Sequence, residues 1–175
     1  MSKREHAGSF MLPVVVMILI PWLLMWLTND VSIGWSFAWP LDMIVMLIGL
    51  AVLFFGLVLL GVCIQMFATI GQGTLAPWAP TQKLVVAGIY RYMRNPMITG
   101  VLIGLLGESI ILSSAAVFLW FLIAFIVNHI YFIKYEEPGL LKRFGDEYVD
   151  YIQNVPRWLP RRTPWIHEST RGRVL

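Results

Sequence analysis

The chain has 175 residues, of which 58% are hydrophobic and 13% are charged. Soluble domains carry about twice that share of charged residues, and disordered chains and coiled coils are more polar still, so the composition argues against all three. A single cysteine, Cys63, excludes an intramolecular disulfide and a zinc site built from several cysteines.

Four apolar stretches are long enough to cross a hydrocarbon core, which takes about 17 to 25 helical residues. The first follows Lys3 and Arg4, as in a signal peptide, but Pro13 and Pro21 interrupt it and no small-residue cleavage site follows. We therefore interpret it as a retained helix, and we expect an all-α membrane bundle. The four predicted transmembrane helices are residues 10–27, 41–68, 96–112 and 115–134.

The basic residues predict the orientation of this bundle. With four spans, all thirteen Lys and Arg residues fall on the side that holds both termini and the loop 69–95, and the opposite connections hold none. Because basic residues are retained on the cytoplasmic face, we expect both termini in the cytoplasm. The net charge of +3 is then mainly a topology signal, with a secondary attraction to membrane lipids, and no nucleic-acid partner is expected.

Small and aromatic residues predict how the spans are anchored and packed. Trp35, Phe37 and Trp39 lie between the first two spans, where aromatic rings anchor helices at a membrane interface. In the third span, Gly100 and Gly104 form a GxxxG pattern that lets another helix approach closely. This pattern suits a homodimer or, more readily in so small a bundle, packing against the second or fourth span.

The third and fourth spans are joined only by a short turn, so they should form a helical hairpin. Asn95 and Pro96 begin the third span with a favourable N-cap and a proline at the first position. The free amides expected there, with Arg94 beside them, suit an anion. Glu108 lies further along this span and either is a structural group or lines a substrate cavity.

Polar side chains gather at the end of the hairpin that faces the cytoplasm in this topology. His129 and Glu136 are seven residues apart, so they share a face on a continuous helix. Glu137 is next in the chain, and Arg91 and Arg94 come from the start of the other span. Such a cluster forms either a binding site or a ring of salt bridges that anchors the hairpin.

The chain after Glu137 has a different pattern. Pro138 is expected to end the fourth helix. Apolar and aromatic residues then recur at spacings of three and four, between charged residues. This periodicity predicts an interfacial amphipathic helix at residues 138–153.

Four segments in this order resemble the isoprenylcysteine carboxyl methyltransferase and phospholipid methyltransferase family of membrane enzymes. They are Gly71-Gln-Gly-Thr-Leu-Ala-Pro77, Leu84-Val-Val-Ala-Gly-Ile-Tyr-Arg-Tyr-Met-Arg-Asn-Pro-Met97, Glu136-Glu137, and Phe144-Gly-Asp-Glu-Tyr148 through Val155-Pro-Arg157. Two positions depart from the family's Arg-His-Pro-x-Tyr motif: Asn95 replaces the His, as in many bacterial relatives, and Ile98 replaces the Tyr.

This resemblance implies an S-adenosylmethionine-dependent methyltransferase, expected in a bacterial inner membrane, with its cofactor pocket facing the cytoplasm. Arg94, Glu137 and His129 are the implied catalytic residues, with His129 or a Glu assisting deprotonation of an amine acceptor, and no metal is implied. The implied cofactor-binding residues are Tyr90, Arg91, Arg94, Asn95, Pro96, Gly100, Glu136 and Glu137.

The acceptor is expected to be lipid-like or small and hydrophobic. The sequence leaves open a carboxyl oxygen, the amine of a phospholipid, or a thiol as the atom that is methylated. A protein of a different class, a non-catalytic membrane scaffold in which the glutamates and arginines only anchor the hairpin, also fits the sequence.

Overall fold

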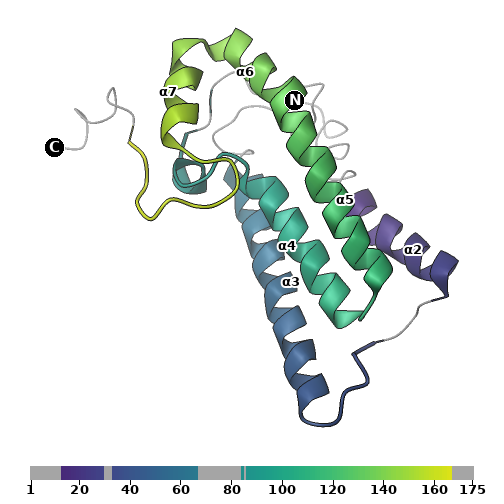
Figure 1. Ribbon diagram of the computed structural model, residues 1–175. Coiled ribbons are helices and arrows are strands. Elements are labelled where there is room, and N and C mark those ends of the chain that lie inside the picture. Colours follow the sequence, from purple (N-terminus) through teal and green to yellow (C-terminus); the bar gives the residue numbers. More distant parts are fainter. Residues whose placement is uncertain (1–12, 30–32, 67–83, 85, 167–175) are drawn as a thin grey trace.

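The computed structural model describes residues 13–29, 33–66, 84 and 86–166, and every regular element among them is helical. The all-α class is therefore confirmed for this part of the chain. Figure 1 shows α3, α4 and α5 side by side, with α2 inclined to them. The elements are η1 (Val15–Leu19), α2 (Ile20–Thr28), α3 (Leu41–Met66), η3 (Gly88–Arg91), α4 (Pro96–Ile111), α5 (Ala115–Tyr131), η4 (Phe132–Glu136), α6 (Glu137–Phe144) and α7 (Asp146–Asn154).

Two of the described helices are long and apolar enough to cross a membrane, Leu41–Met66 and Ala115–Phe144. Two further apolar helices are shorter, Val15–Thr28 and Pro96–Ile111. The segment that begins at Gly71 lies outside the described residues, as do the basic residues near both termini. The described helices thus include two with the length of a membrane span and two apolar helices packed beside them.

Glycines bring α3 and α4 into backbone contact. A Cβ atom on Gly56 of α3 would lie 2.5 Å from the backbone nitrogen of Gly104 and 2.7 Å from the carbonyl oxygen of Gly100, both on α4. A Cβ on Gly107 would meet the backbone nitrogen of Leu53 at 2.5 Å. The GxxxG pattern of α4 is therefore occupied by α3 within the same chain, which is one of the two arrangements that the pattern allows.

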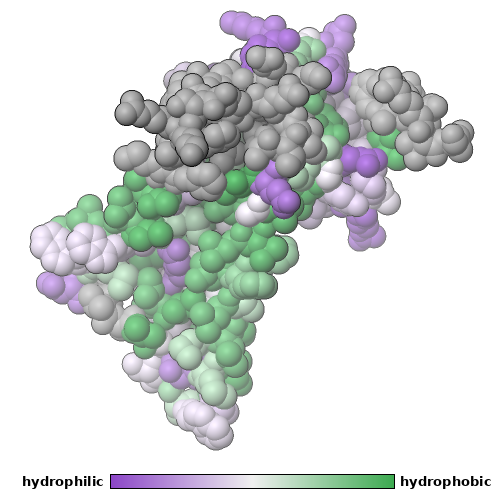
Figure 2. Space-filling model, turned by 180° about the vertical axis from the view of Figure 1, so that it is seen from behind, coloured by the Kyte–Doolittle hydropathy of each residue, from purple (hydrophilic) through white to green (hydrophobic). Residues whose placement is uncertain are grey.

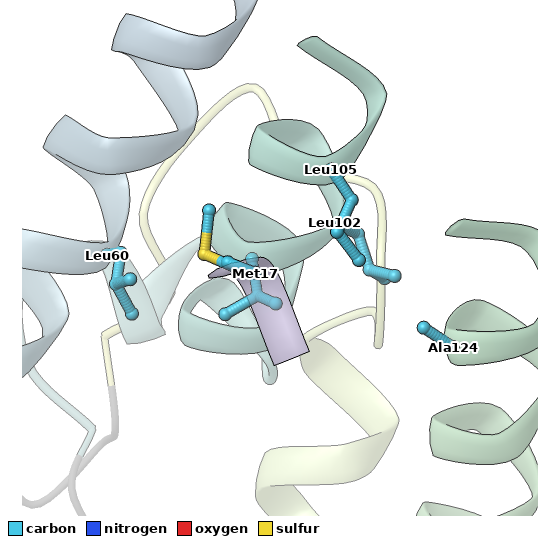
Figure 3. Packing of buried hydrophobic residues seen from close by; sticks show 6 residues of the cluster. Met17, Leu60, Leu102, Leu105 and Ala124 are labelled. Carbon is cyan, nitrogen blue, oxygen red and sulfur yellow. The ribbon is translucent and has the colours of Figure 1, made fainter. Parts of the chain in front are cut away.

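Helix α4 is the centre of the bundle. Half of its 16 residues are buried, and its Leu102 and Leu105 meet Met17 of η1, Leu60 of α3 and Ala124 of α5 in one apolar cluster (Figure 3). The outward faces of the neighbouring helices are apolar as well. Figure 2 shows a hydrophobic surface along the helices, with most of the strongly hydrophilic side chains beyond one end of it. This distribution suits a protein that is surrounded by lipid.

The helix that begins at Ala115 does not end at Pro138, which corrects the sequence-based expectation. The amide of Glu137 instead bonds the carbonyl of Phe132, five residues back, in the π turn η4. Proline cannot donate a backbone hydrogen bond and its ring clashes with the carbonyl four residues earlier; the wider turn relieves both problems. The break comes at Gly145, where φ is +53°. Residues 138–153 therefore belong to two helices, α6 and α7.

The turn between α4 and α5 is short, as the hairpin prediction requires. Ser114 occupies the N-cap position of α5, and its hydroxyl accepts a hydrogen bond from the amide of Val117 at 3.4 Å. The loop before α3 covers this end of α4: the Trp35 indole donates to the carbonyl of Ile110 at 2.8 Å, and the Gly34 amide donates to that of Ile111 at 3.0 Å. Trp35 therefore caps a helix in addition to its expected place at the interface.

Candidate functional site

The opposite end of α4 is covered by the C-terminal segment, residues 155–165, which we call the strap. Figure 1 shows this segment, in yellow, crossing near the start of α4. Four backbone hydrogen bonds of 2.9 to 3.3 Å join it to the chain just before that helix. They run from the amides of Arg94 and Asn95 to the carbonyls of Pro156 and Arg157, and from the amides of Arg161 and Trp165 to the carbonyls of Tyr92 and Arg91.

One expectation about the start of α4 is corrected. Asn95 occupies the N-cap position, but its side chain makes no capping hydrogen bond. The amides of Arg94 and Asn95, which precede the helix, donate to strap carbonyls. That the amides of the first helical turn bind an anion stays a prediction.

Glu137 is the centre of a compact charge cluster. Its Oε1 accepts hydrogen bonds from Nη1 of Arg94 at 2.7 Å and from Nε of Arg157 at 2.8 Å, and its Oε2 accepts one from Nη2 of Arg157 at 2.9 Å. The side chains of Arg94 and Glu137 are only 12% and 21% exposed. The hydrogen bond to Glu137 raises the pKa of Arg157, so this guanidinium stays charged. Two cations thus share one carboxylate.

Arg94 has a buried donor that the protein does not use. Its Nε atom is buried and has no hydrogen-bond partner among the described residues. A buried guanidinium N–H without a partner is unusual, since buried donors are nearly always paired. Burial, together with the charge of Glu137, raises the pKa of the nearby Tyr148 phenol to about 12, although the positive charge of Arg94 opposes this rise. Tyr148 is therefore uncharged, and it does not offset the positive charge that two arginines and one glutamate leave in this cluster.

Glu136 lies beside this cluster and is half-buried. Within the part of the chain that the structure describes, its carboxylate makes no hydrogen bond and no salt bridge, but it acts electrostatically on the neighbouring phenols of Tyr90 and Tyr148. The two adjacent glutamates therefore differ. Glu137 is fully engaged by arginines, whereas Glu136 keeps its acceptor capacity for another cation or donor.

The π turn η4 determines which glutamate meets the arginines. In a regular α-helix, residues seven apart share a face, which is why the sequence pairs Glu136 with His129. The π turn η4 lies after His129 and adds one residue to the helix. Glu137, eight residues after His129, therefore lies on the same face as His129 in place of Glu136. The strap contacts agree with this shift, because Trp158 bonds His129 and the preceding Arg157 bonds Glu137.

His129 is held by an aromatic group from the strap. The Trp158 indole Nε1 donates a hydrogen bond to Nδ1 of His129 at 3.0 Å. An indole N–H can only donate, so Nδ1 is the unprotonated nitrogen and the neutral ring carries its proton on Nε2. In this arrangement Nδ1 is already occupied as an acceptor and Nε2 is a donor.

The other residues singled out from the sequence lie around this cluster. Tyr90 is buried between α3 and the C-terminal helices, and its carbonyl accepts a hydrogen bond from the Tyr151 hydroxyl at 2.7 Å. The Arg91 Nε donates to the carbonyl of Trp165 at 2.7 Å and not to a glutamate. Pro96 is buried at the start of α4, and Gly100 packs against α3. The structure thus brings Arg94 to Glu137, joins the Asn95 backbone to the strap and leaves Gly100 in a helix contact.

Sequence reasoning about this site omitted three side chains that the structure brings to it, Arg157, Tyr148 and Trp158. Arg157 lies in a segment that resembles a family motif, but a helix break separates it from Glu137 along the chain, and no local pattern predicts their contact. Among the described residues, no group of three His, Cys, Asp or Glu side chains has the arrangement of a metal site.

Part of the chain is similar to curated proteins. Protein-S-isoprenylcysteine O-methyltransferase B of Arabidopsis thaliana is 38% identical over 81 residues, which cover 45% of this chain and 40% of that protein. The probable protein-S-isoprenylcysteine O-methyltransferase of Oryza sativa subsp. japonica is also 38% identical over 81 residues, 45% of this chain and 41% of that protein. The match thus spans less than half of each relative.

A family model covers more of the chain than these relatives do. The model of the phospholipid methyltransferase family matches residues 44–147, from α3 to the start of α7. This range is more than half of the chain, and it contains Arg94 and both glutamates. The chain therefore belongs to the phospholipid methyltransferase family.

Proposed function

We propose that this protein is an S-adenosylmethionine-dependent membrane methyltransferase that acts on a lipophilic or small membrane-accessible acceptor. Membership of the family supports the reaction class. The observation that carries the proposal is the buried, unpartnered Nε of Arg94 in a cluster where two guanidiniums share one carboxylate. Such a cluster has a donor and a positive charge left for an anion.

The residues present suit the methyl donor. Its carboxylate would be held by Arg94, with Arg157 adding positive charge, and its ammonium by the carboxylate of Glu136. When bound, S-adenosylmethionine supplies a methyl group on a positively charged sulfur. The other predicted cofactor-binding residues would shape the surroundings of this site. Arg91 would add a positive charge there, and the uncharged ones are Tyr90, Asn95, Pro96 and Gly100.

The protein would act mainly by positioning. Methyl transfer is an in-line displacement, so its rate depends on holding the acceptor and the methyl group in reactive geometry and on keeping water out. The strap lies over the start of α4 and is attached to α5 and α6 by Trp158 and Arg157. Glu137 would contribute indirectly, because it orients both arginines.

Among the acceptors, a carboxylate oxygen is favoured. A carboxylate needs no base, whereas an amine must lose a proton before it attacks. His129 would be such a base only after breaking its bond to Trp158, since Nδ1 is occupied and Nε2 carries the proton. The amine of a phospholipid remains the second candidate, with Glu136 as the group that accepts the proton. A thiol acceptor is the third.

We also propose the four-span topology, with both termini and the charge cluster on the cytoplasmic side of a bacterial inner membrane. The segregation of all thirteen Lys and Arg residues supports this orientation. A Ser113→Cys variant tests it, because Cys63 is fully buried and adds little background labelling. Labelling by an impermeant reagent from the periplasmic side supports the topology, and labelling only from the cytoplasmic side contradicts it.

Calorimetric binding of S-adenosylhomocysteine to the detergent-purified protein tests the site. We expect wild type to bind and Arg94→Lys, which keeps the charge but loses Nε, to bind about tenfold more weakly, in line with the strength of a charged hydrogen bond. Arg162→Lys, at an exposed position, is the matched control. Absence of binding by wild type at millimolar ligand would favour the non-catalytic scaffold.

The acceptor atom is tested by incubating membranes with methyl-labelled donor. A labelled methyl ester releases volatile methanol in alkali, whereas a methylated amine or thioether retains its label. Release of the label supports the carboxyl acceptor, and its retention would favour the phospholipid amine or the thiol.

A further inference from the structure

Trp158 attaches the strap to α5 and η4 through its side chain. Besides its hydrogen bond to His129, its ring lies 5.2 Å from that of Phe125 and 5.6 Å from that of Phe132, centre to centre. It also packs against the apolar cluster that α4 shares with α5. Asn128, the neighbouring polar residue on α5, donates to a carbonyl of its own helix and takes no part.

The bond between Trp158 and His129 lies close to the charge cluster in the chain. Arg157 immediately precedes Trp158 and forms two hydrogen bonds to Glu137. Because the π turn brings His129 and Glu137 to the same face, adjacent strap residues are attached to one helix at two points. The strap amides and carbonyls add a third attachment, at the start of α4.

These contacts make the two attachments interdependent. Without the bond at His129, the ion pair would be the one polar side-chain contact left between Arg157 or Trp158 and this helix, beside non-directional ring packing, and a bound ammonium or a water molecule can compete for that ion pair. With that bond in place, the Arg157 guanidinium is held against Glu137, and Glu137 in turn holds Arg94. The orientation of Arg94, and hence the direction of its unused Nε donor, then depends on a hydrogen bond one residue away from Arg157.

We propose that Trp158 and His129 are positioning residues that set the affinity of the site for a carboxylate-bearing ligand by holding Arg157 on Glu137. This inference rests on the proposed function. Neither side chain touches the ligand. The Trp158 donor and the His129 acceptor act only as a pair, so loss of either has the same consequence as loss of both.

The test is a double-mutant cycle in which the affinity of each variant for S-adenosylhomocysteine is measured. Trp158→Phe keeps a ring and loses the donor, and His129→Phe keeps a ring and loses the acceptor. We expect each variant to bind about tenfold more weakly and the double variant to bind no more weakly than either. His129→Gln, whose side-chain oxygen can accept from Trp158, should restore most of the affinity. Trp22→Phe, at an exposed position on α2, is the matched control.

Hydrogen exchange provides a readout that needs no ligand. We expect the strap and residues 91–95 to exchange faster in both single variants than in wild type, and His129→Gln to restore their protection. Additive losses of affinity, unchanged affinity, or loss of folding in both single variants would overturn the proposal. If wild type binds no S-adenosylhomocysteine but the strap shows this exchange pattern, the proposed function fails while the coupling between Trp158 and His129 stands.

Discussion

The two ends of α4 are closed in different ways. At the Ile111 end, neutral donors from the loop before α3 satisfy the last carbonyls of the helix. At the Pro96 end, the strap takes the amides that precede the helix, but Arg94 keeps a buried donor without a partner and Glu136 keeps an unpaired carboxylate. The last backbone carbonyls of the first end are satisfied within the protein, although the buried Oε2 of nearby Glu108 has no hydrogen-bond partner among the described residues, and the second end has both a donor and an acceptor for a ligand. Four substitutions test this difference.

The largest effect is expected at the charged end. Glu137→Gln leaves two mostly buried guanidiniums without their anion, and breaking such a partly buried pair should lower the free energy of unfolding by about 3 kcal/mol. The affinity for S-adenosylhomocysteine should fall at least tenfold in protein that still inserts and stays monodisperse. Unfolding in detergent and calorimetry measure the two effects. Normal binding by this variant would remove Glu137 from the site.

A substitution between the two ends should change stability more than ligand binding. Gly56→Ala introduces a Cβ that would lie 2.5 Å from a backbone nitrogen of α4, and overpacking of this kind costs about 1 to 3 kcal/mol. Gly61→Ala, on the same helix with no atom within 4 Å of the new Cβ, is the matched control. We expect it to be neutral or slightly stabilising. Equal thermal stability of the two variants would contradict the close contact of α3 and α4.

At the neutral end, Trp35→Phe removes the indole donor from the carbonyl of Ile110. Trp35 is 45% exposed, so we expect a loss of no more than about 1 kcal/mol in the free energy of unfolding. The affinity for S-adenosylhomocysteine should not change. A loss of affinity would show that the two ends of α4 are coupled.

The smallest effect on ligand binding is expected at Glu108. Its Oε2 is buried without a hydrogen-bond partner among the described residues, and it lies fourteen residues after Arg94, about 20 Å along the helix. Glu108→Gln should leave calorimetric affinity for S-adenosylhomocysteine unchanged. A change in acceptor methylation alone would favour the interpretation that Glu108 lines a substrate cavity.

Some of this arrangement was predictable because it depends on local pattern. Runs of apolar residues and the Asn95–Pro96 step indicate where α3, α4 and α5 begin, and a short turn forces α4 and α5 into a hairpin. The hairpin in turn brings Arg94 close to the Glu136–Glu137 pair. Pro138 was misleading, since a proline normally ends a helix and the π turn that accommodates it has no clear signal in sequence.

The sequence by itself determined the class of protein, the helical hairpin and the meeting of opposite charges at one end, because composition and periodicity decide which faces must be buried in lipid or protein. Only the tertiary structure decided which glutamate pairs with the arginines and which donor remains free. Those outcomes depend on a one-residue shift in helix phase and on the path of the strap. Contacts between residues distant in sequence, such as Arg157 with Glu137, exist only once the chain has folded back on itself.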